Sequence, residues 1–133
     1  YRAFPSTAAL AAADVSVFKE SGAGYRDEYL KATAQRIFTE GIDGLDALPT
    51  AQLKKALLTY KGIGPKVADC VAFFGFRKTD SFPVDTWIEK VYFEDFKGTL
   101  KDRTKIAKYL TDTFGEHSGY IQQYLFYGKR LNL

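Results

Sequence analysis

The chain has 133 residues, of which 46% are hydrophobic and 26% charged, and this composition is that of an ordinary globular domain. It excludes a transmembrane protein, because no stretch approaches the ~18 consecutive apolar residues of a membrane span, and its single cysteine excludes an internal disulfide and a four-cysteine metal cluster. The net charge of +3 permits a nucleic-acid partner but does not by itself indicate one.

Helical patterns follow one another along the chain, and no window shows the sustained alternation of a β-strand. Ser6 can cap the first helix, and Pro49-Thr50 is a start signal for the third. Because no repeat, linker or low-complexity tract divides these segments, the sequence predicts one all-α domain over residues 1–133. In chain order its predicted helices, about seven, span 6–21, 25–40, 48–60, 65–76, 85–96, 100–114 and 118–131.

Apolar side chains recur at helical spacing in three of these segments and predict which faces are buried. In 48–60 they are Leu53, Leu57 and Tyr60, at i, i+4 and i+7. In 25–40 the predicted face carries Tyr25, Tyr29, Leu30, Ile37 and Phe38. In 65–76 the predicted buried stripe is Val67, Cys70, Val71 and Phe74.

The tetrapeptide Lys61-Gly62-Ile63-Gly64 separates the third and fourth predicted helices and indicates a hairpin over about 51–77. Its two glycines allow positive φ angles and a close approach to another molecule. Pro65 suits the first position of the following helix. The free N–H groups of such a hairpin can bind a DNA phosphate, although an ordinary tight turn is the commoner origin of a lone G-x-G pattern.

Three side chains after the Lys61–Gly64 turn raise a choice between structure and chemistry. Lys66 lies in the first helical turn, where the dipole disfavours a cation; it is either a solvated partner of Asp69 at i+3 or a nucleophilic amine. Cys70, one turn on, is either core or the wall of a pocket for a flat ring. Asp85 precedes a helix and is expected to cap it, and the same carboxylate could stabilise positive charge on a sugar.

These residues together resemble a known family. The stretch KGIGPKVADC, followed by FPVD with 19 positions from Lys66 to Asp85 (85 − 66), resembles the helix-hairpin-helix DNA glycosylases with a Gly/Pro…Asp signature. The VADC directly after the lysine is typical of the 8-oxoguanine branch. The resemblance also includes FPS at 4–6, GYR at 24–26 and GYIQQYLF at 119–126, so it covers nearly the whole chain.

The resemblance implies a role for each matching residue at the reaction centre. Lys66 would be the Schiff-base nucleophile at the sugar C1′, and Asp85 the carboxylate that assists it. Cys70 and Phe126 would lie against the two faces of the extruded base, while Gln122 would hydrogen-bond its Watson–Crick edge. A flipped base needs flat surfaces on both faces and a polar group to read its edge. The plain alternatives are core packing for Phe126 and a solvated helix position for Gln122.

The resemblance also implies contacts with the rest of the duplex. Tyr25 and Arg26 would enter it beside the lesion, with Arg26 facing the orphaned cytosine; a core Tyr25 and a local pairing of Arg26 with a neighbouring acid are the alternatives. Thr86 would partly replace a phosphate-binding histidine of the eukaryotic members, and His117 is interpreted as a surface residue without a role. The hairpin residues that would hold a phosphate are Lys61, Gly62, Ile63 and Gly64.

The activity implied is that of a bifunctional DNA N-glycosylase and abasic-site lyase, which excises 8-oxoguanine from duplex DNA. It implies a monomer without metal or iron–sulfur cluster, with a monovalent cation at the hairpin as the one ion expected. Double-stranded DNA containing an oxidised purine would be its partner, in the cytoplasm or nucleoid of a bacterium or in the nucleus of a eukaryote.

The resemblance implies as well that this chain is the later, hairpin-bearing portion of the family's fold. The β-rich N-terminal domain and the upstream helices of the family have no counterpart in this sequence. Two alternatives to the enzyme therefore stay open, a non-catalytic helix-hairpin-helix module that holds DNA without sequence preference and a fragment that folds but is inactive.

Overall fold

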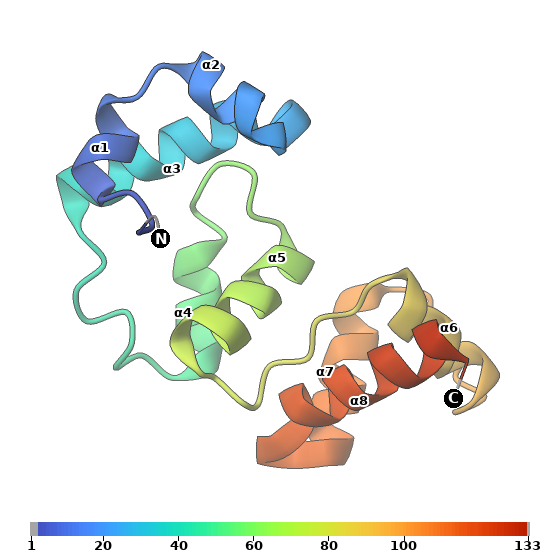
Figure 1. Cartoon of the computed structure of the whole chain (residues 1–133). Helices are drawn as coiled ribbons and strands as arrows, with labels where there is room; N and C mark the ends of the chain where they lie inside the picture. Colours follow the sequence, from blue (N-terminus) through green and yellow to red (C-terminus); the bar gives the residue numbers. More distant parts are fainter. Residues whose placement is uncertain (1–2, 133) are drawn as a thin grey trace. The chain divides into compact units, whose positions relative to one another are not determined.

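The computed structural model describes residues 3–132, which contain helices and no β-strand (Figure 1). The predicted all-α fold class is confirmed. These residues divide into two compact units, of which the first runs to Ala47 and includes Thr59–Gly62, and the second contains Leu48–Leu58 and the chain from Ile63 onward. The single domain predicted over 1–133 stays a prediction. No helix in the described part of the chain is long and apolar enough to cross a membrane.

The first unit begins with two short helices where the sequence predicts one. Helix α1 (Thr7–Ala12) ends at Ala13, whose backbone is extended, and α2 (Val15–Phe18) follows. The break has a local cause, because the carboxylate of Asp14 accepts a hydrogen bond of 2.9 Å from the N–H of Ser16 and so caps a new helix. The predicted helix over 6–21 is therefore wrong in its middle, although Ser6 caps its start as expected.

The π turn η1 (Lys19–Ala23) and the 3₁₀ turn η2 (Gly24–Arg26) connect α2 to α3 (Asp27–Glu40), against which α1 and α2 pack. The Lys31 ammonium of α3 donates to the carbonyls of Ala11 and Ala13 at the end of α1. The predicted apolar face of α3 is only partly right. Its buried residue is Ala34, whereas Tyr25, Leu30 and Phe38 of that face are exposed.

The segment Thr59–Gly62, at the turn of the hairpin, is bound to α3 within the first unit. The Arg36 guanidinium donates to the carbonyl of Thr59 at 2.9 Å and lies 4.1 Å from the centre of the Tyr60 ring. Gly62 has a φ of +84°, and a Cβ there would come within 2.3 Å of the Tyr29 ring. The positive φ that glycine allows is therefore adopted at this position, and the ring that a side chain here would meet is the chain's own Tyr29.

The second unit contains the remaining helices. Their N-terminal ends follow local signals, since Pro65 is the first residue of its helix, and Asp85 and Asp102 cap theirs through side-chain oxygens. The helix predicted from 100 begins only after Asp102. The elements are α4 (Thr50–Leu57), α5 (Pro65–Cys70) with the π turn η3 (Val71–Gly75), α6 (Thr86–Glu94), α7 (Arg103–Phe114), the 3₁₀ turn η4 (Gly115–His117) and α8 (Ser118–Leu131).

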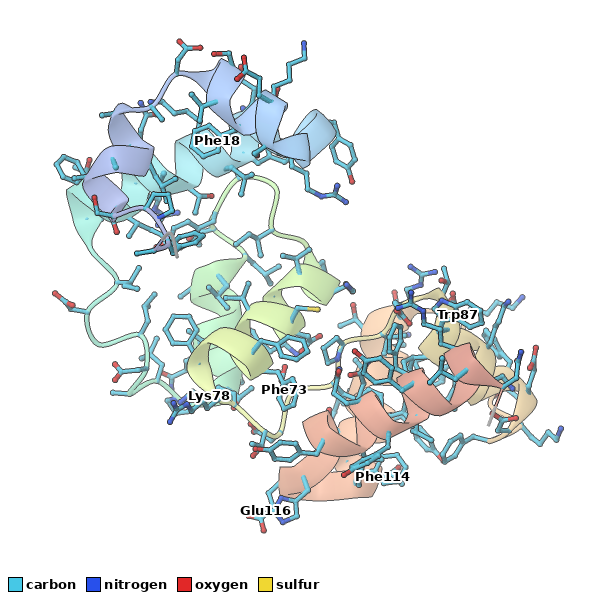
Figure 2. All side chains as sticks on the ribbon, in the orientation of Figure 1. Phe18, Phe73, Lys78, Trp87, Phe114 and Glu116 are labelled. Carbon is cyan, nitrogen blue, oxygen red and sulfur yellow. The ribbon has the colours of Figure 1, made fainter. Side chains whose placement is uncertain are left out.

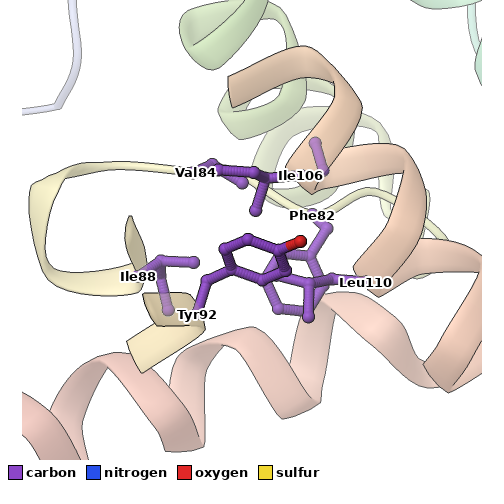
Figure 3. Close-up of a cluster of buried hydrophobic side chains, with 7 residues drawn as sticks. Phe82, Val84, Ile88, Tyr92, Ile106 and Leu110 are labelled. Carbon is purple, nitrogen blue, oxygen red and sulfur yellow. The ribbon is translucent and has the colours of Figure 1, made fainter. Parts of the chain in front are cut away.

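The core of this unit lies where the extended segment 82–84 meets α6 and α7 (Figure 3). Leu125 and Phe126 of α8 pack against it, which holds α8 in place beside α6 and α7. In the same unit Phe73 (labelled in Figure 2) contacts the Tyr120 ring of α8 edge to face, with 5.5 Å between the ring centres. The buried residues of the core are Phe82, Val84, Ile88, Tyr92, Ile106, Ala107 and Leu110.

The stripe predicted for 65–76 is wrong. Val67 and Phe74 are exposed at 40% and 63% of their surface, and Cys70 and Val71 are half-buried. α5 and η3 pack against α4, and the small side chains of Ala68 and Ala72 suit such a close contact. The buried carboxylate of Asp69 is paired with Lys54 and Ser81. The buried residues of this segment are Ala68, Asp69, Ala72 and Phe73.

Candidate active site

A cavity of about 230 Å³ in the second unit brings together all five residues that the sequence assigns to the reaction and to the base. Three walls form it, namely α5 with η3, the segment before α6, and α8. Lys66 and Cys70 come from the first wall, Asp85 from the second, and Gln122 and Phe126 from the third. Their individual roles stay predictions, but residues that are 56 positions apart in the sequence (122 − 66) line one cavity.

The Lys66 side chain is exposed in the first turn of α5 and does not pair with Asp69. The Oδ1 of Asp69 instead lies 2.6 Å from the Nζ of Lys54 and accepts a hydrogen bond of 2.7 Å from the Oγ of Ser81. Among residues 3–132, no hydrogen bond or ion pair engages the Lys66 amine. The solvated-pair alternative for Lys66 therefore loses its proposed partner.

Asp85 caps α6, as the sequence predicts. Its Oδ1 accepts hydrogen bonds from the backbone N–H groups of Trp87 at 3.0 Å and Ile88 at 2.9 Å. Because one oxygen makes both bonds, the orientation of the carboxylate is set by the backbone of the helix it begins. The second oxygen accepts no hydrogen bond within the described part of the chain.

A cation on α7 adds to the electrostatics around Asp85. The Arg103 guanidinium is bound to Glu89 of α6, with its Nε 3.1 Å and its Nη2 2.6 Å from Oε2. This hydrogen bond raises the pKa of Arg103, burial opposes the rise, and the nearby charges of Glu89 and Asp85 add to it. Arg103 is thus a permanent positive charge held close to the carboxylate of the cavity.

The α8 wall combines a buried amide with an aromatic ring. Gln122 is buried, and its Oε1 accepts a hydrogen bond of 2.5 Å from the Nε2 of Gln123. Phe126, one turn further, packs against the core and also lines the cavity, so its core and pocket interpretations both hold. An amide beside apolar surfaces can bind a flat heterocycle and read its polar edge.

Four lining residues were missed by the sequence reasoning: Phe74, Pro83, Gln123 and Tyr127. Phe74 lies at i+4 from Cys70 and i+8 from Lys66, so helical spacing could have placed it on the same face, but its hydrophobicity pointed to the core. Pro83 is part of the FPVD motif. Nothing in the sequence distinguishes Gln123 or Tyr127 from their neighbours on α8.

The predicted DNA-contacting residues lie in both units. In the second unit Thr86 is the exposed first residue of α6, and Ile63 is half-buried. Gly64 has a φ of −91° and caps α5 with its backbone, so the positive φ that glycine allows is used at Gly62 and not at Gly64. In the first unit are Gly62 and the exposed Lys61, whose Nζ lies 5.8 Å from the centre of the Tyr29 ring.

Tyr25 and Arg26, also in the first unit, form the turn η2 together with Gly24. Tyr25 is exposed at 73% of its surface and is therefore not a core residue, and the Arg26 guanidinium lies 4.3 Å from the centre of its ring. His117 is exposed in η4, 3.5 Å from Glu116, as expected for a surface residue.

Similar proteins were found by sequence and by structure, although no family model matches the chain. A probable N-glycosylase/DNA lyase of Methanothermobacter thermautotrophicus is 36% identical over 110 residues, which are 81% of this chain and 35% of the relative. The N-glycosylase/DNA lyase OGG1 of Arabidopsis thaliana is 30% identical over 139 residues, covering 95% of this chain and 38% of the relative.

Among solved structures, an 8-oxoguanine glycosylase/lyase of Clostridium acetobutylicum, in complex with dsDNA containing cytosine opposite 8-oxoG, superposes with a TM-score of 0.91. It is 34% identical, and the match covers 100% of this chain and 47% of that one. The chain therefore spans a little over a third of the length of these curated relatives and about half of that solved chain.

Proposed function

We propose that this chain, which belongs to the 8-oxoguanine branch of the helix-hairpin-helix DNA glycosylases, carries the reaction centre of a bifunctional enzyme of base excision repair. That enzyme removes 8-oxoguanine from duplex DNA and cleaves the strand at the resulting site. The single observation that carries the proposal is the cavity in which Lys66 and Asp85 meet the three base-binding side chains. The names of the relatives and the DNA-bound neighbour support it.

In the proposed reaction the damaged nucleotide leaves the base stack, at a cost of a few kcal/mol, and its base enters the cavity. Cys70 and Phe126 provide apolar surfaces for the two faces of the ring, and the amide of Gln122 bonds its Watson–Crick edge. Phe74 and Tyr127 extend the apolar lining, so water is displaced from the base as it binds.

Chemistry then proceeds through a covalent imine. The Lys66 amine attacks C1′ of the sugar as the bond from C1′ to the base breaks, and the base departs after taking up a proton. The sugar ring opens to give the imine, a proton leaves C2′, and the bond from C3′ to its phosphate oxygen breaks by β-elimination. The Asp85 carboxylate stabilises the positive charge that develops on the sugar and then moves the protons.

The surroundings of Lys66 suit a nucleophile. The neighbouring carboxylate of Asp69, which could have paired with the amine and held it away from a substrate, is occupied by Lys54 and Ser81. The Asp85 carboxylate is held in place by the backbone of α6, so it can act without first being reoriented.

Double-stranded DNA with an oxidised purine is the proposed partner of a monomeric enzyme. The hairpin Lys61–Gly64 would bind a backbone phosphate, together with a monovalent cation on its carbonyls, and Thr86 would add a contact at the start of α6. Tyr25 and Arg26, exposed in η2, would occupy the gap that the flipped base leaves and face the cytosine. Such an enzyme would work at the nucleoid of a bacterium or in the nucleus of a eukaryote.

Borohydride trapping on a duplex with one 8-oxoguanine opposite cytosine tests the proposal, because borohydride reduces the imine to a stable bond between protein and DNA. We expect an adduct with the wild-type chain and none with Lys66→Gln, whose affinity for the duplex should be unchanged. Lys55→Gln, which changes an exposed lysine of α4 outside the cavity, is the matched control and should retain the adduct.

Two outcomes would contradict the proposal. An adduct that persists in Lys66→Gln would show that another amine attacks the sugar. A wild-type chain that binds the duplex but forms no adduct would favour the non-catalytic module or the inactive fragment. The non-catalytic module predicts in addition an affinity that falls steeply with salt and is the same for lesion and undamaged DNA.

A further inference from the structure

Asp69 is a buried acidic residue that the proposed reaction does not use. It is exposed at only 3% of its surface and lies in α5 between Lys66 and Cys70 in the sequence. Its Oδ1 meets the Nζ of Lys54 from α4 at 2.6 Å and the Oγ of Ser81 at 2.7 Å. The Ser81 hydroxyl also lies 3.2 Å from the carbonyl oxygen of Asp69. Three segments of the second unit therefore meet at one carboxylate.

Stability alone does not account for this ion pair, in which the carboxylate is buried and the Lys54 side chain is half-buried. Removing a carboxylate and an ammonium from water costs several kcal/mol per ion, and their attraction seldom exceeds this cost by much. Apolar side chains of similar size in the same place often give an equal or higher free energy of unfolding. An ion pair with directed hydrogen bonds instead favours one rotation of α5 about its axis. In that rotation the Asp69 carboxylate reaches both Lys54 and Ser81.

That rotation bears directly on the cavity. Lys66 precedes Asp69 by three residues and Cys70 follows it, so a turn of α5 about its axis would move both side chains in the cavity wall. Ser81 precedes Asp85 by four residues, and the segment between them is buried. The carboxylate thus joins the helix that carries the proposed nucleophile to the segment that carries the assisting carboxylate.

The third wall is fastened to the same segment. The backbone N–H of Gly119, near the start of α8, donates a hydrogen bond of 2.7 Å to the carbonyl of Thr79. Thr79 lies two residues before Ser81, the partner of Asp69. All three walls of the cavity are therefore connected through residues 79–81 and the Asp69 carboxylate.

We propose that Asp69, held by Lys54 and Ser81, is a positioning residue that sets the Lys66 amine relative to the Asp85 carboxylate. It acts through these two residues and touches neither substrate nor reacting atoms. The inference rests on the proposed function in one respect, that the spacing of Lys66 and Asp85 matters because they react with the same sugar. A misplacement of about 1 Å can slow such a reaction by about 10²-fold.

The test is the double variant Lys54→Met/Asp69→Leu, which replaces the ion pair by an apolar pair without leaving a lone buried charge. We expect its thermal stability to equal or exceed that of the wild type. Its rate of borohydride adduct formation on an abasic-site duplex should nevertheless fall by about tenfold or more. Its affinity for that duplex should be unchanged, so the loss would be in the rate of reaction and not in binding.

The matched control is Lys108→Met/Asp112→Leu on α7. That pair has a similar separation, 2.7 Å from Nζ to Oδ2, but is largely exposed and lies away from the cavity. It should react at the wild-type rate. Lys54→Arg, which can keep the ion pair with Asp69, should retain most of the rate and so shows whether the pairing is what matters.

A second measurement does not depend on catalysis. Cys70 is the chain's only cysteine, adjoins Asp69 and lines the cavity, so the rate at which a thiol reagent labels it reports the rotation of α5. We expect this rate to change in Lys54→Met/Asp69→Leu and not in the α7 control. A stable double variant with wild-type labelling and wild-type adduct formation would overturn the inference. If the wild-type chain forms no adduct, the proposed function fails. In that case, wild-type labelling of Cys70 in Lys54→Met/Asp69→Leu would overturn the positioning of α5 as well.

Discussion

Asp85 accepts a hydrogen bond of 2.9 Å at its Oδ1 from the backbone N–H of Ile88, so the carboxylate that lines the cavity also begins α6. Capping and catalysis are compatible here because they use different properties of one side chain. The cap needs an oxygen acceptor in a fixed place, whereas the proposed chemistry needs a negative charge. The two requirements can therefore be separated by substitution.

Asp85→Asn should keep the cap and lose the charge. Asparagine caps helices as well as aspartate does, so the free energy of unfolding should change by no more than a few tenths of a kcal/mol. Borohydride adduct formation should slow by about 10²-fold or more, because the group that assists proton transfer is gone. Asp85→Ala, the comparison variant, should lose the same activity and also about 1 kcal/mol of stability. An asparagine variant that reacts at the wild-type rate would exclude a catalytic role.

Phe126→Ala should separate base removal from strand cleavage. Stacking of a base on an aromatic ring is worth about 1–3 kcal/mol, so excision of 8-oxoguanine should slow by about 5- to 150-fold. Cleavage at a preformed abasic site should be nearly unchanged, because no base has to be bound there. That reaction also serves as the check on folding, since Phe126 packs against the core.

The control for Phe126→Ala is Tyr124→Ala, which removes an exposed ring of the same helix outside this cavity. Equal losses on both DNA substrates in Phe126→Ala would assign Phe126 to the core and not to the base. A loss of base excision in Tyr124→Ala would show that the stacking surface extends along α8.

Gly119→Ala tests how closely α8 approaches its neighbours. An added Cβ would lie 2.5 Å from Cδ2 of Phe73 and 2.9 Å from the carbonyl oxygen of Ser81, closer than real contacts allow. We expect a loss of about 1–3 kcal/mol in the free energy of unfolding, measured by denaturant titration. Gly128→Ala on the same helix meets nothing within 4 Å and should be neutral or gain up to about 1 kcal/mol. Equal behaviour of the two variants would contradict the close packing at Gly119.

Asp14→Ala should destabilise the chain in a pH-dependent way. The hydrogen bond from the backbone of Ser16, above all other causes, lowers the pKa of Asp14 in the folded chain. A lowered folded-state pKa contributes stability above the unfolded pKa of about 3.9, and this stability is lost as the pH falls through the folded value. Thermal unfolding should therefore show a deficit for Asp14→Ala at pH 7 that shrinks in strong acid.

Ser6→Ala is the matched control for Asp14→Ala. Ser6 caps α1 with a hydroxyl that does not titrate, accepting a hydrogen bond of 3.2 Å from the N–H of Ala9. Its removal should cost about 1 kcal/mol at either pH. A deficit of Asp14→Ala that stays constant down to strong acid would show that the charge of Asp14 does not contribute to the cap.

Local signals in the sequence were reliable where their cause is local. The cap at Asp85, the proline that begins α5 and the positive φ of Gly62 each depend on neighbours a few residues away. Asp14 was the exception. Its capping of α2 is equally local, but the alanine-rich run around it favoured one continuous helix over two short ones.

The faces of the helices could not be predicted in the same way. Hydrophobicity placed Phe74 in the core, whereas the structure exposes it, and hydrophobicity gave no sign that Asp69 would be buried. Phe74 lines the cavity, whereas the burial of Asp69 depends on Lys54 and Ser81, which lie 15 residues before it (69 − 54) and 12 after it (81 − 69). A pattern of spacing within one helix contains no information about such partners.

The sequence by itself determined the helical class, most of the helices, the Lys61–Gly64 turn and, through a family's motif, the five residues that the cavity brings together. These follow from interactions along one segment and from residue types at fixed spacing. Only the tertiary structure decided that Lys66 has no acidic partner on its own helix, that Phe74 and Gln123 join the lining, and that Asp69 joins α5 to the segment before α6. The reason is physical: the burial of a side chain and the partner of a charge are set by segments distant in the sequence, and these meet only when the chain folds.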